Sequence, residues 1–146
     1  MAVWVKTTGS NIPEGAIRAG YEKDGKPLFI AQANMANRLL TPGKCGYHLP
    51  GAHISFGSKE QVVKQYEVLV HHNGTPGFYD WIHASNGEVP THAYQTDRNM
   101  YVGRAVYSGS LIPCKIITSP RFRRAYMGYG GMSHDTKENE VLCQIK

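Results

Sequence analysis

The side chains best suited to bind a small ligand stand beside two turns. Glu22, preceded by Tyr21, opens the turn 23–26, and Lys44 ends the short segment 42–44, Pro-Gly-Lys. A carboxylate accepts hydrogen bonds from paired hydroxyls, an ammonium donates three, and an aromatic ring covers the apolar face of a sugar. These residue types therefore suit a neutral ligand rich in hydroxyl groups. As an arbitrary exposed pair, Glu22 and Lys44 are more simply explained as solvated turn charges.

The sequence contains an internal repeat. LLTPGKC at 39–45 resembles SLIPCKI at 110–116, which places Lys115 at the position of Lys44. Further matches follow in the same order: 4–16 with 81–93, 28–33 with 100–105, 52–58 with 125–131, and 67–69 with 140–142. Such ordered self-similarity indicates a tandem duplication. We expect one domain made of two repeats, about 1–76 and 77–146.

The second repeat offers a weaker candidate site around Lys115. Its hairpin is shorter, so the counterpart of Glu22 is either Asp97 or Asn99, both in the turn 96–99. The alternative is that only the scaffold is retained and that Lys115 is a surface residue.

The composition is that of a globular protein. The 146 residues are 41% hydrophobic and 18% charged, and no apolar run is long enough to cross a bilayer. A chain of this length buries one ordinary core, so the two repeats are expected to share it. The N-terminus lacks the pattern of a secretory signal. The expectation is a cytoplasmic protein, or one released by a non-classical route.

Turn residues punctuate short segments rich in Val, Ile, Tyr and Phe, which predicts an all-β fold of short antiparallel strands. Asp24-Gly25 predicts a tight primed turn between strands at 16–22 and 27–33. The segment 66–72 alternates as a half-buried strand does. Only 59–65 has the pattern of a turn or two of helix, and the sequon at 73–75 is assigned to a loop.

No metal, cofactor or catalytic group is predicted. Three cysteines without a Cys-x-x-Cys spacing indicate neither a disulfide framework nor zinc, and the carboxylates are too scattered for a calcium loop. Cys45 and Cys114 are assigned to equivalent repeat positions as small buried side chains. A thiol hydrolase built from Cys45 with His48 or His53 lacks an orienting third group.

The net charge of +5 raises the question of an anionic partner. The densest basic cluster is Arg121-Phe122-Arg123-Arg124. One short cluster without a nucleic-acid motif makes nucleic acid an unlikely partner. The alternative to binding a hydroxyl-rich ligand is a pattern-recognition or scaffold protein that binds anionic surfaces through Arg121, Arg123 and Arg124.

The segments IPEGAIRAGYEKDGKPLFIAQA, PGKC, AHISFGSKE and YEVL together resemble the DM-nine repeat family, which includes natterin-like proteins and mannose-specific lectins of bivalves. The resemblance covers both repeats. It implies an all-β fold with strands exchanged between repeats, a homodimer, and metal-independent recognition of mannose and high-mannose glycans on microbial surfaces in innate immunity.

The resemblance also implies a role for particular residues. It assigns the sugar to Glu22 and Lys44, with Tyr21 as a packing neighbour. The acidic position is associated with aspartate in the family, and here it holds glutamate. Substituting alanine for Glu22 or Lys44 is then expected to abolish mannose binding and to leave the fold intact. A link between natterin-like proteins and proteolysis keeps an enzyme as the minor alternative.

Overall fold

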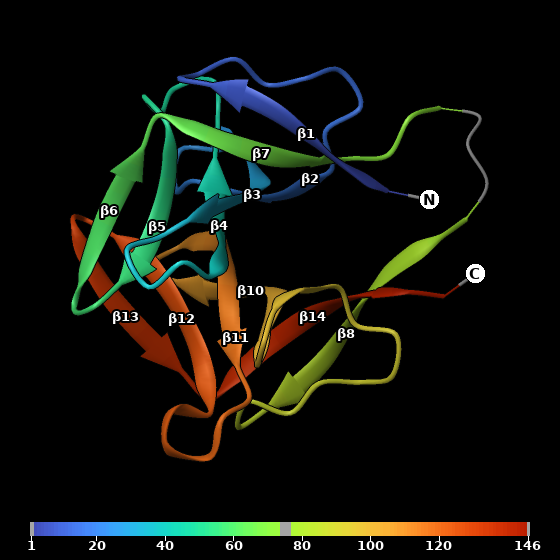
Figure 1. Cartoon of the computed structure of the whole chain (residues 1–146), viewed down its shortest axis with the longest axis vertical. Coiled ribbons are helices and arrows are strands. Elements are labelled where there is room, and N and C mark those ends of the chain that lie inside the picture. The colour runs from blue at the N-terminus through green and yellow to red at the C-terminus, as the bar shows by residue number, and fades with distance from the viewer. Residues whose placement is uncertain (1, 74–76, 146) are drawn as a thin grey trace.

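Strands separated by short turns account for most of the chain (Figure 1). The structure, a computed structural model, describes residues 2–73 and 77–145. Within these residues the first repeat forms β1 (Val3–Thr8), β2 (Arg18–Tyr21), β3 (Pro27–Asn34), β4 (Leu40–Cys45), β5 (Ala52–Phe56), β6 (Lys59–Val63) and β7 (Gln65–Val70). The second forms β8 (Tyr79–Ser85), β9 (Gln95–Asp97), β10 (Met100–Tyr107), β11 (Ser110–Ile117), the 3-10 turn η1 (Pro120–Phe122), β12 (Arg124–Tyr129), β13 (Met132–Thr136) and β14 (Glu138–Gln144). The all-β prediction is confirmed.

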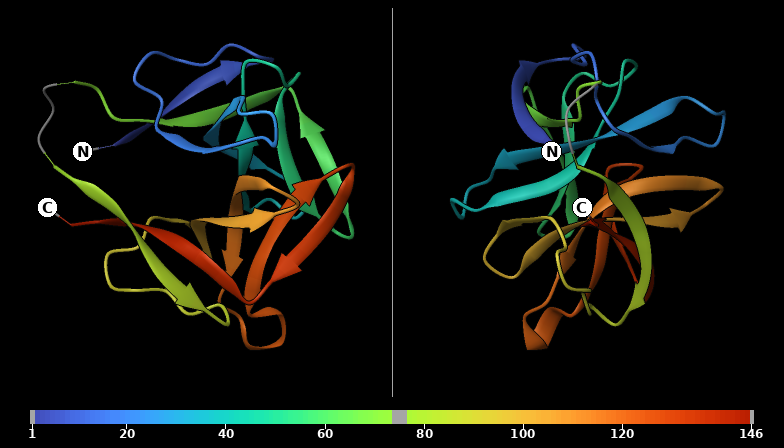
Figure 2. Two further views of the ribbon diagram at one scale, coloured as in Figure 1. Left: turned by 180° about the vertical axis from the view of Figure 1, so that it is seen from behind. Right: turned by 90° about the vertical axis from the view of Figure 1, so that its right-hand side faces the viewer.

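The order of the strands in the sheet reads the same from both ends. It runs β1-β7-β3-β4-β5-β6 through the first repeat and continues β13-β12-β11-β10-β14-β8 through the second, with β2 and β9 off this path. The halves therefore join where β6 pairs with β13, at Lys59 and Met132. Figure 1 shows the first repeat above the second, and Figure 2 shows the same two layers from behind and from the side.

The two repeats also share their strand registers. Ile54 pairs with Gln61 in the first repeat, and the residues 73 positions later, Met127 and His134, pair in the second. Likewise, Lys44 pairs with His53 on β5, and Lys115 pairs with Tyr126 on β12, which lies 73 positions after His53. The duplication visible in the sequence is thus preserved in the backbone.

The core has three parts. One buried cluster lies wholly in the first repeat and a second wholly in the second. A third joins them, because Ile30 and Leu69 of the first repeat pack with Val102 and Leu142 of the second. These four side chains are fully buried or nearly so. Strand exchange is limited: β2 pairs with β3 of its own repeat and also, through Tyr21, with Leu111 on β11 of the other.

The helix predicted at 59–65 is wrong. Residues 59–63 form β6, which folds back on β5 after a turn where Gly57 has a positive φ of 67°. The register pairs Val62 with His53 and Lys59 with Phe56. The β-branched side chains of this segment favour a strand, and the preceding glycine turn brings it into register with β5.

The hairpin between β2 and β3 is present, but its turn is not the predicted primed type. Only Gly25 has a positive φ, at 92°, whereas a primed turn of that kind needs two such residues. The amide of Gly25 donates to the backbone oxygen of Glu22 at 2.9 Å, and the amide of Glu22 donates to the backbone oxygen of Lys26 at 2.8 Å. Three residues therefore form the loop, and Asp24 accepts a bond from the Lys26 amide at 3.1 Å.

Cys45 and Cys114 are buried as predicted, but they are not equivalent, because Cys45 pairs with Phe29 and Cys114 with Gly103. The predicted end of the first repeat at 76 and part of the predicted loop at 73–75 lie outside the described residues. No helix within 2–73 and 77–145 has the length and apolar character needed to cross a membrane.

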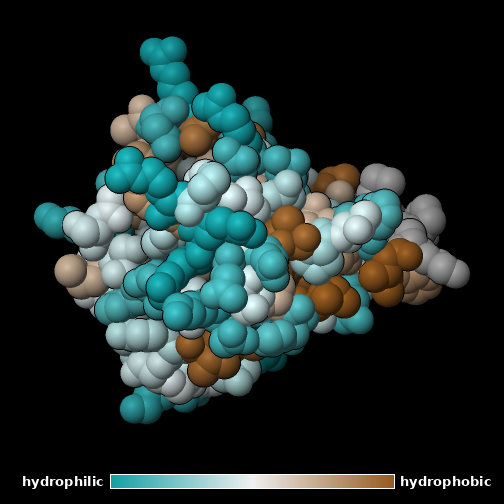
Figure 3. All heavy atoms as spheres, turned by 90° about the horizontal axis from the view of Figure 1, so that it is seen from below, coloured by the Kyte–Doolittle hydropathy of each residue, from teal (hydrophilic) through white to brown (hydrophobic). Residues whose placement is uncertain are grey.

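The face seen from below in Figure 3 is mostly hydrophilic. Hydrophobic side chains gather on its right-hand side, where the chain ends lie in Figure 1. The exposed large apolar residues of β1, β8 and the segments that flank β8 and β14 are Val3, Ile82, Phe78 and Ile145.

Candidate ligand-binding sites

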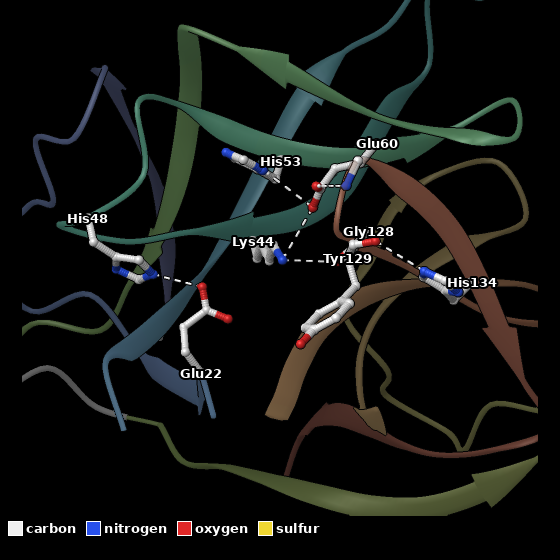
Figure 4. Close-up of polar contacts among 9 residues, drawn as sticks. Glu22, Lys44, His48, His53, Glu60, Gly128, Tyr129 and His134 are labelled. Atoms are coloured by element: carbon white, nitrogen blue, oxygen red, sulfur yellow. Dashed lines mark hydrogen bonds and ion pairs between the residues drawn. The ribbon is translucent and has the colours of Figure 1, made fainter. Parts of the chain in front are cut away.

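Lys44 lies in a buried polar network between the repeats (Figure 4). Its side chain is 5% exposed. The Nζ atom donates to the backbone oxygen of Gly128 on β12 at 2.9 Å and lies 3.2 Å from Oε2 of Glu60 on β6. Because Gly128 belongs to the second repeat, Lys44 ties β4 of one repeat to β12 of the other. It is not the exposed turn residue that the sequence predicts.

Glu60 is the buried counter-ion of Lys44. Its carboxylate is 7% exposed, accepts a hydrogen bond from the amide of Gly131 at 3.0 Å, and lies 3.3 Å from Nδ1 of His53. Burial alone would raise the pKa of Glu60, but the His53 hydrogen bond, the Lys44 charge and the Gly131 amide outweigh burial and lower that pKa to about 2. Glu60 is therefore ionised at neutral pH and compensates the charge of Lys44.

Glu22 lines a separate cavity of about 350 Å³. Its Oε2 atom lies 2.8 Å from Nε2 of His48, and the two side chains are 21% and 22% exposed. A turn that begins at Gly46 presents His48, and a Cβ at Gly46 would come within 2.9 Å of the imidazole ring, so a larger residue at 46 would displace the ring. The other residues that line this cavity are Lys23, Asp24, Lys26, Ser110 and Tyr129.

Two of these residues come from the second repeat. Ser110 is 1% exposed, and its Oγ atom has no hydrogen-bond partner among the described residues. Since buried hydroxyls are almost always paired in proteins, this hydroxyl is suited to a ligand hydroxyl. The ring of Tyr129 supplies an aromatic wall, and its centroid lies 5.8 Å from Nζ of Lys44. Lys44 itself does not line the cavity.

Tyr21 does not share this cavity with Glu22. It pairs with Pro27 on β3 and with Leu111 on β11, is 44% exposed, and lines another cavity that contains Arg104. Neighbouring residues of an extended segment point to opposite sides. The aromatic neighbour of Glu22 is therefore Tyr129 and not Tyr21.

Lys115 on β11 is mostly buried and has a neutral environment. Its Nζ atom donates to the backbone oxygen of Ser55 at 2.5 Å and lies 5.8 Å and 5.9 Å from the ring centroids of Phe56 and Tyr126. Burial lowers the pKa of Lys115 to about 8. No carboxylate of the described residues lies within ion-pair distance of this ammonium.

The repeat explains this difference. An offset of 73 residues places Ser55 at the position of Gly128, and both backbone oxygens accept a bond from a lysine of the other repeat. The same offset places Ser133 at the position of Glu60. The Ser133 hydroxyl forms a hydrogen bond with that of Ser55. The second repeat therefore keeps the lysine and lacks its counter-ion.

Lys115 and Asn99, two of the three candidates for a second site, line the same cavity of about 340 Å³. Asp97 does not line it. Its carboxylate accepts hydrogen bonds from the backbone amides of Leu40 at 2.7 Å and Arg98 at 2.8 Å, and these bonds lower the pKa of Asp97. Asp97 thus secures the β9–β10 turn against β4.

The cysteines are poor candidates for nucleophiles. Burial raises the pKa of Cys45 and of Cys114 to about 12, so neither thiol ionises near neutral pH. The two histidines proposed as bases for Cys45 are both engaged with carboxylates, His48 with Glu22 and His53 with Glu60. The geometry gives no support to a thiol hydrolase.

The basic cluster surrounds η1. Arg121 and Arg123 are exposed, as is Phe122 between them. Arg124 lies 3.3 Å from Asp135 on β13, which compensates its charge. The cluster therefore presents fewer uncompensated charges than its sequence indicates.

Comparison with known proteins agrees with the fold. The family model of the DM9 repeat matches residues 1–44, 34–97 and 94–146. The middle match extends from before β4 to the end of β9, so it crosses the boundary between the two structural repeats.

Two individual proteins are also similar. Natterin-4 of Thalassophryne nattereri is 26% identical over 104 residues, which are 71% of this chain and 25% of that protein. This chain therefore spans only a quarter of that relative. The crystal structure of the nematode sperm cell motility protein MFP2B superposes with a TM-score of 0.70 at 15% identity over 99% of this chain and 46% of that chain, which shows a shared fold. Since matches to the repeat model extend over the whole sequence, the chain belongs to the DM9 repeat family and is natterin-like.

Proposed function

We propose that the protein is a non-enzymatic lectin that binds mannose and high-mannose glycans in the cavity lined by Glu22, without a metal ion. The observation that carries this proposal is the set of groups gathered there: the Glu22 carboxylate, the unpaired Ser110 hydroxyl and the Tyr129 ring. His48 engages only one carboxylate oxygen of Glu22. The other oxygen is available to a sugar hydroxyl.

The wall of the cavity supplies donors as well as acceptors. Lys23 and Lys26 line it, and Lys26 lies 3.2 Å from Asp24. Direct hydrogen bonds from these groups, with a ring against the apolar face of the sugar, meet the requirements for recognising a monosaccharide. A metal ion is not needed to hold the sugar.

In this proposal Lys44 acts as a positioning residue. It holds the backbone of Gly128, and the next residue on β12, Tyr129, carries the ring that lines the cavity. Lys44 therefore affects the sugar site through the position of Tyr129.

The test is a calorimetric titration with mannose, with galactose as the control sugar and with a chelator present or absent. We expect selective binding that the chelator does not change. Glu22→Gln removes the charge at nearly constant size and should weaken binding at least tenfold, because hydrogen bonds to a charged group contribute about 1.5–3 kcal/mol. Glu14→Gln, at an exposed position outside the cavity, is the matched control. Equal affinity of parent and Glu22→Gln for mannose would contradict the site.

A single sugar contact is weak, so we propose that a homodimer raises avidity for clustered microbial glycans in innate immune recognition. The edge strands β1 and β8, with the exposed apolar residues near them, offer a surface for the second copy. We also infer that each copy is one domain of two repeats, supported by the core cluster that both repeats share. Sedimentation analysis should give twice the mass of the chain, and a monomer at micromolar concentration would contradict the dimer.

A further inference from the structure

The cavity beside Lys115 differs in charge from the cavity beside Glu22. Two cationic side chains line it, Lys115 and Arg98, and no Asp or Glu stands among its described lining residues. The nearby Asp97 carboxylate is already bonded to two backbone amides. The cavity is therefore electropositive.

The ammonium of Lys115 has unused capacity for hydrogen bonding. Of its three N–H groups, one reaches the Ser55 oxygen, and the neighbouring rings are those of Phe56 and Tyr126. A charge taken out of water is costly unless an opposite charge or several hydrogen bonds compensate it. In the first repeat Glu60 supplies that compensation. In the second repeat the corresponding Ser133 does not, so the charge of Lys115 has no counter-ion among the described residues.

The rest of the cavity suits a small organic molecule. Asn99 and Ser119 supply amide and hydroxyl groups, while Leu39, Met100 and Ile117 supply apolar surface. The position of Leu39 corresponds to Ser110 in the other cavity, so the cavity beside Lys115 is less suited to a ligand with hydroxyls on every side. At about 340 Å³ it is of ordinary ligand-binding size.

We propose that the cavity beside Lys115 binds a small organic anion, whose carboxylate or phosphate group pairs with Lys115 and Arg98 while its body lies against the apolar wall. This replaces the second neutral-sugar site expected from the duplication. It does not depend on mannose binding at Glu22, because the two cavities have different lining residues.

The experiment measures binding of glucuronate, glucose 6-phosphate and neutral glucose by calorimetry at millimolar ligand. The comparison of glucuronate with glucose isolates the carboxylate, and glucose 6-phosphate shows whether phosphate is preferred. We expect either anion to bind at least tenfold more tightly than glucose, with an affinity that falls as salt is added. Equal binding of all three would overturn the proposal.

Three variants locate the site. Lys115→Met removes the charge at similar volume. Ser133→Glu combined with Ser55→Gly reproduces the glutamate and glycine packing of the first repeat and supplies an internal carboxylate. Each of these variants should reduce anion binding at least tenfold. Arg98→Gln, on an exposed turn where folding is not at risk, should reduce it severalfold. Lys64→Met, an exposed lysine away from the cavity, is the matched control. Anion affinity unchanged in both Lys115→Met and Arg98→Gln would overturn the assignment.

Two further readouts separate this site from its neighbours. Mannose binding should be the same in Lys115→Met and in the parent, so failure of the anion site and failure of the mannose site are distinguishable. Anion affinity should also fall above about pH 8, where Lys115 loses its proton. The other titratable side chains that line the cavity are Arg98 and Tyr126, and burial raises the pKa of Tyr126. Affinity independent of pH up to 10 would contradict a role for the Lys115 charge.

Discussion

Lys44 and Lys115 occupy the same position in two copies of one structural unit, yet their charges are handled differently. Each donates to a backbone oxygen of the opposite repeat and lies near an aromatic ring. Lys44 also has Glu60, whereas the corresponding Ser133 gives Lys115 no counter-ion. A duplicated lysine can thus have an internal counter-ion in one repeat and none among the described residues in the other.

Where the first repeat has Glu60 the second has Ser133, and the facing residue differs as well: Gly128 faces Glu60, whereas the larger Ser55 faces Ser133. A Cβ at Gly128 would come within 2.6 Å of the Glu60 carboxylate, so glycine is needed wherever the glutamate is present. In the other half, serine faces serine, and Ser55 and Ser133 bond to each other. Glutamate with glycine and serine with serine are therefore two alternative packings of one interface.

The largest expected effect separates the two lysines by stability. Lys44→Met leaves Glu60 buried without its cation and should lower the free energy of unfolding by about 3–5 kcal/mol. Lys115→Met leaves no charge behind and should change it by less than about 1 kcal/mol. Urea unfolding of both variants beside the parent measures the difference. Equal losses would contradict the contrast between the sites and restore the expectation that Lys44→Ala leaves the fold intact.

Acid should act mainly on the first repeat. The pKa of Glu60 is about 2 in the folded chain and is expected to be near 4.5 when the chain unfolds. Its ionised form therefore stabilises the fold by about 3 kcal/mol above pH 4.5, and this stabilisation is lost as the pH falls towards 2. The difference in unfolding free energy between the parent and Glu60→Gln should be wide at pH 7 and should shrink by about 2–3 kcal/mol by pH 2.5. A difference in unfolding free energy that does not change with pH would show that the Glu60 charge is not the source of the stabilisation.

A smaller effect is expected from adding one methyl group. Gly128→Ala should displace the Glu60 side chain, which Lys44 and Gly131 hold, at a cost of about 1–3 kcal/mol. Ser55→Ala, at the corresponding position, removes one hydroxyl and should cost about 1 kcal/mol. Thermal unfolding of Gly128→Ala and Ser55→Ala beside the parent measures the two losses of stability. Unchanged stability of Gly128→Ala would mean that the Glu60 carboxylate has room to move.

The sequence predicted the fold because its signals are local. Short β-branched segments, turn residues and the ordered repeats indicate strands and a duplication without knowledge of long-range contacts. The errors at 59–65 and at the turn around Gly25 have a common origin. In each segment the structure depends on a backbone register that is set by a glycine of positive φ. The residue types alone are compatible with more than one backbone conformation.

The site was predicted only in part, because it is built across the two repeats. Glu22 and Lys44 were candidates because of the family resemblance, and Lys115 because of the repeat. Lys44 does not line the Glu22 cavity, and Tyr129 and Ser110 reach that cavity from the other repeat. No periodicity shows which strand of one repeat faces a lysine of the other. The pairing of Lys44 with Glu60 was equally hidden, since they are 16 positions apart and only the β4–β5–β6 register brings them together.

The most direct test of this account is the pKa of Lys115, measured by an NMR titration of ¹³C-labelled lysine side chains and assigned with Lys115→Met. We expect titration near pH 8 in the parent. In Ser133→Glu combined with Ser55→Gly, where the introduced carboxylate favours the charged form, we expect a rise towards the ordinary value of about 10.4. A Lys115 that already titrates near 10.4 in the parent would show that its charge is compensated, and the distinction between the two repeats would fail.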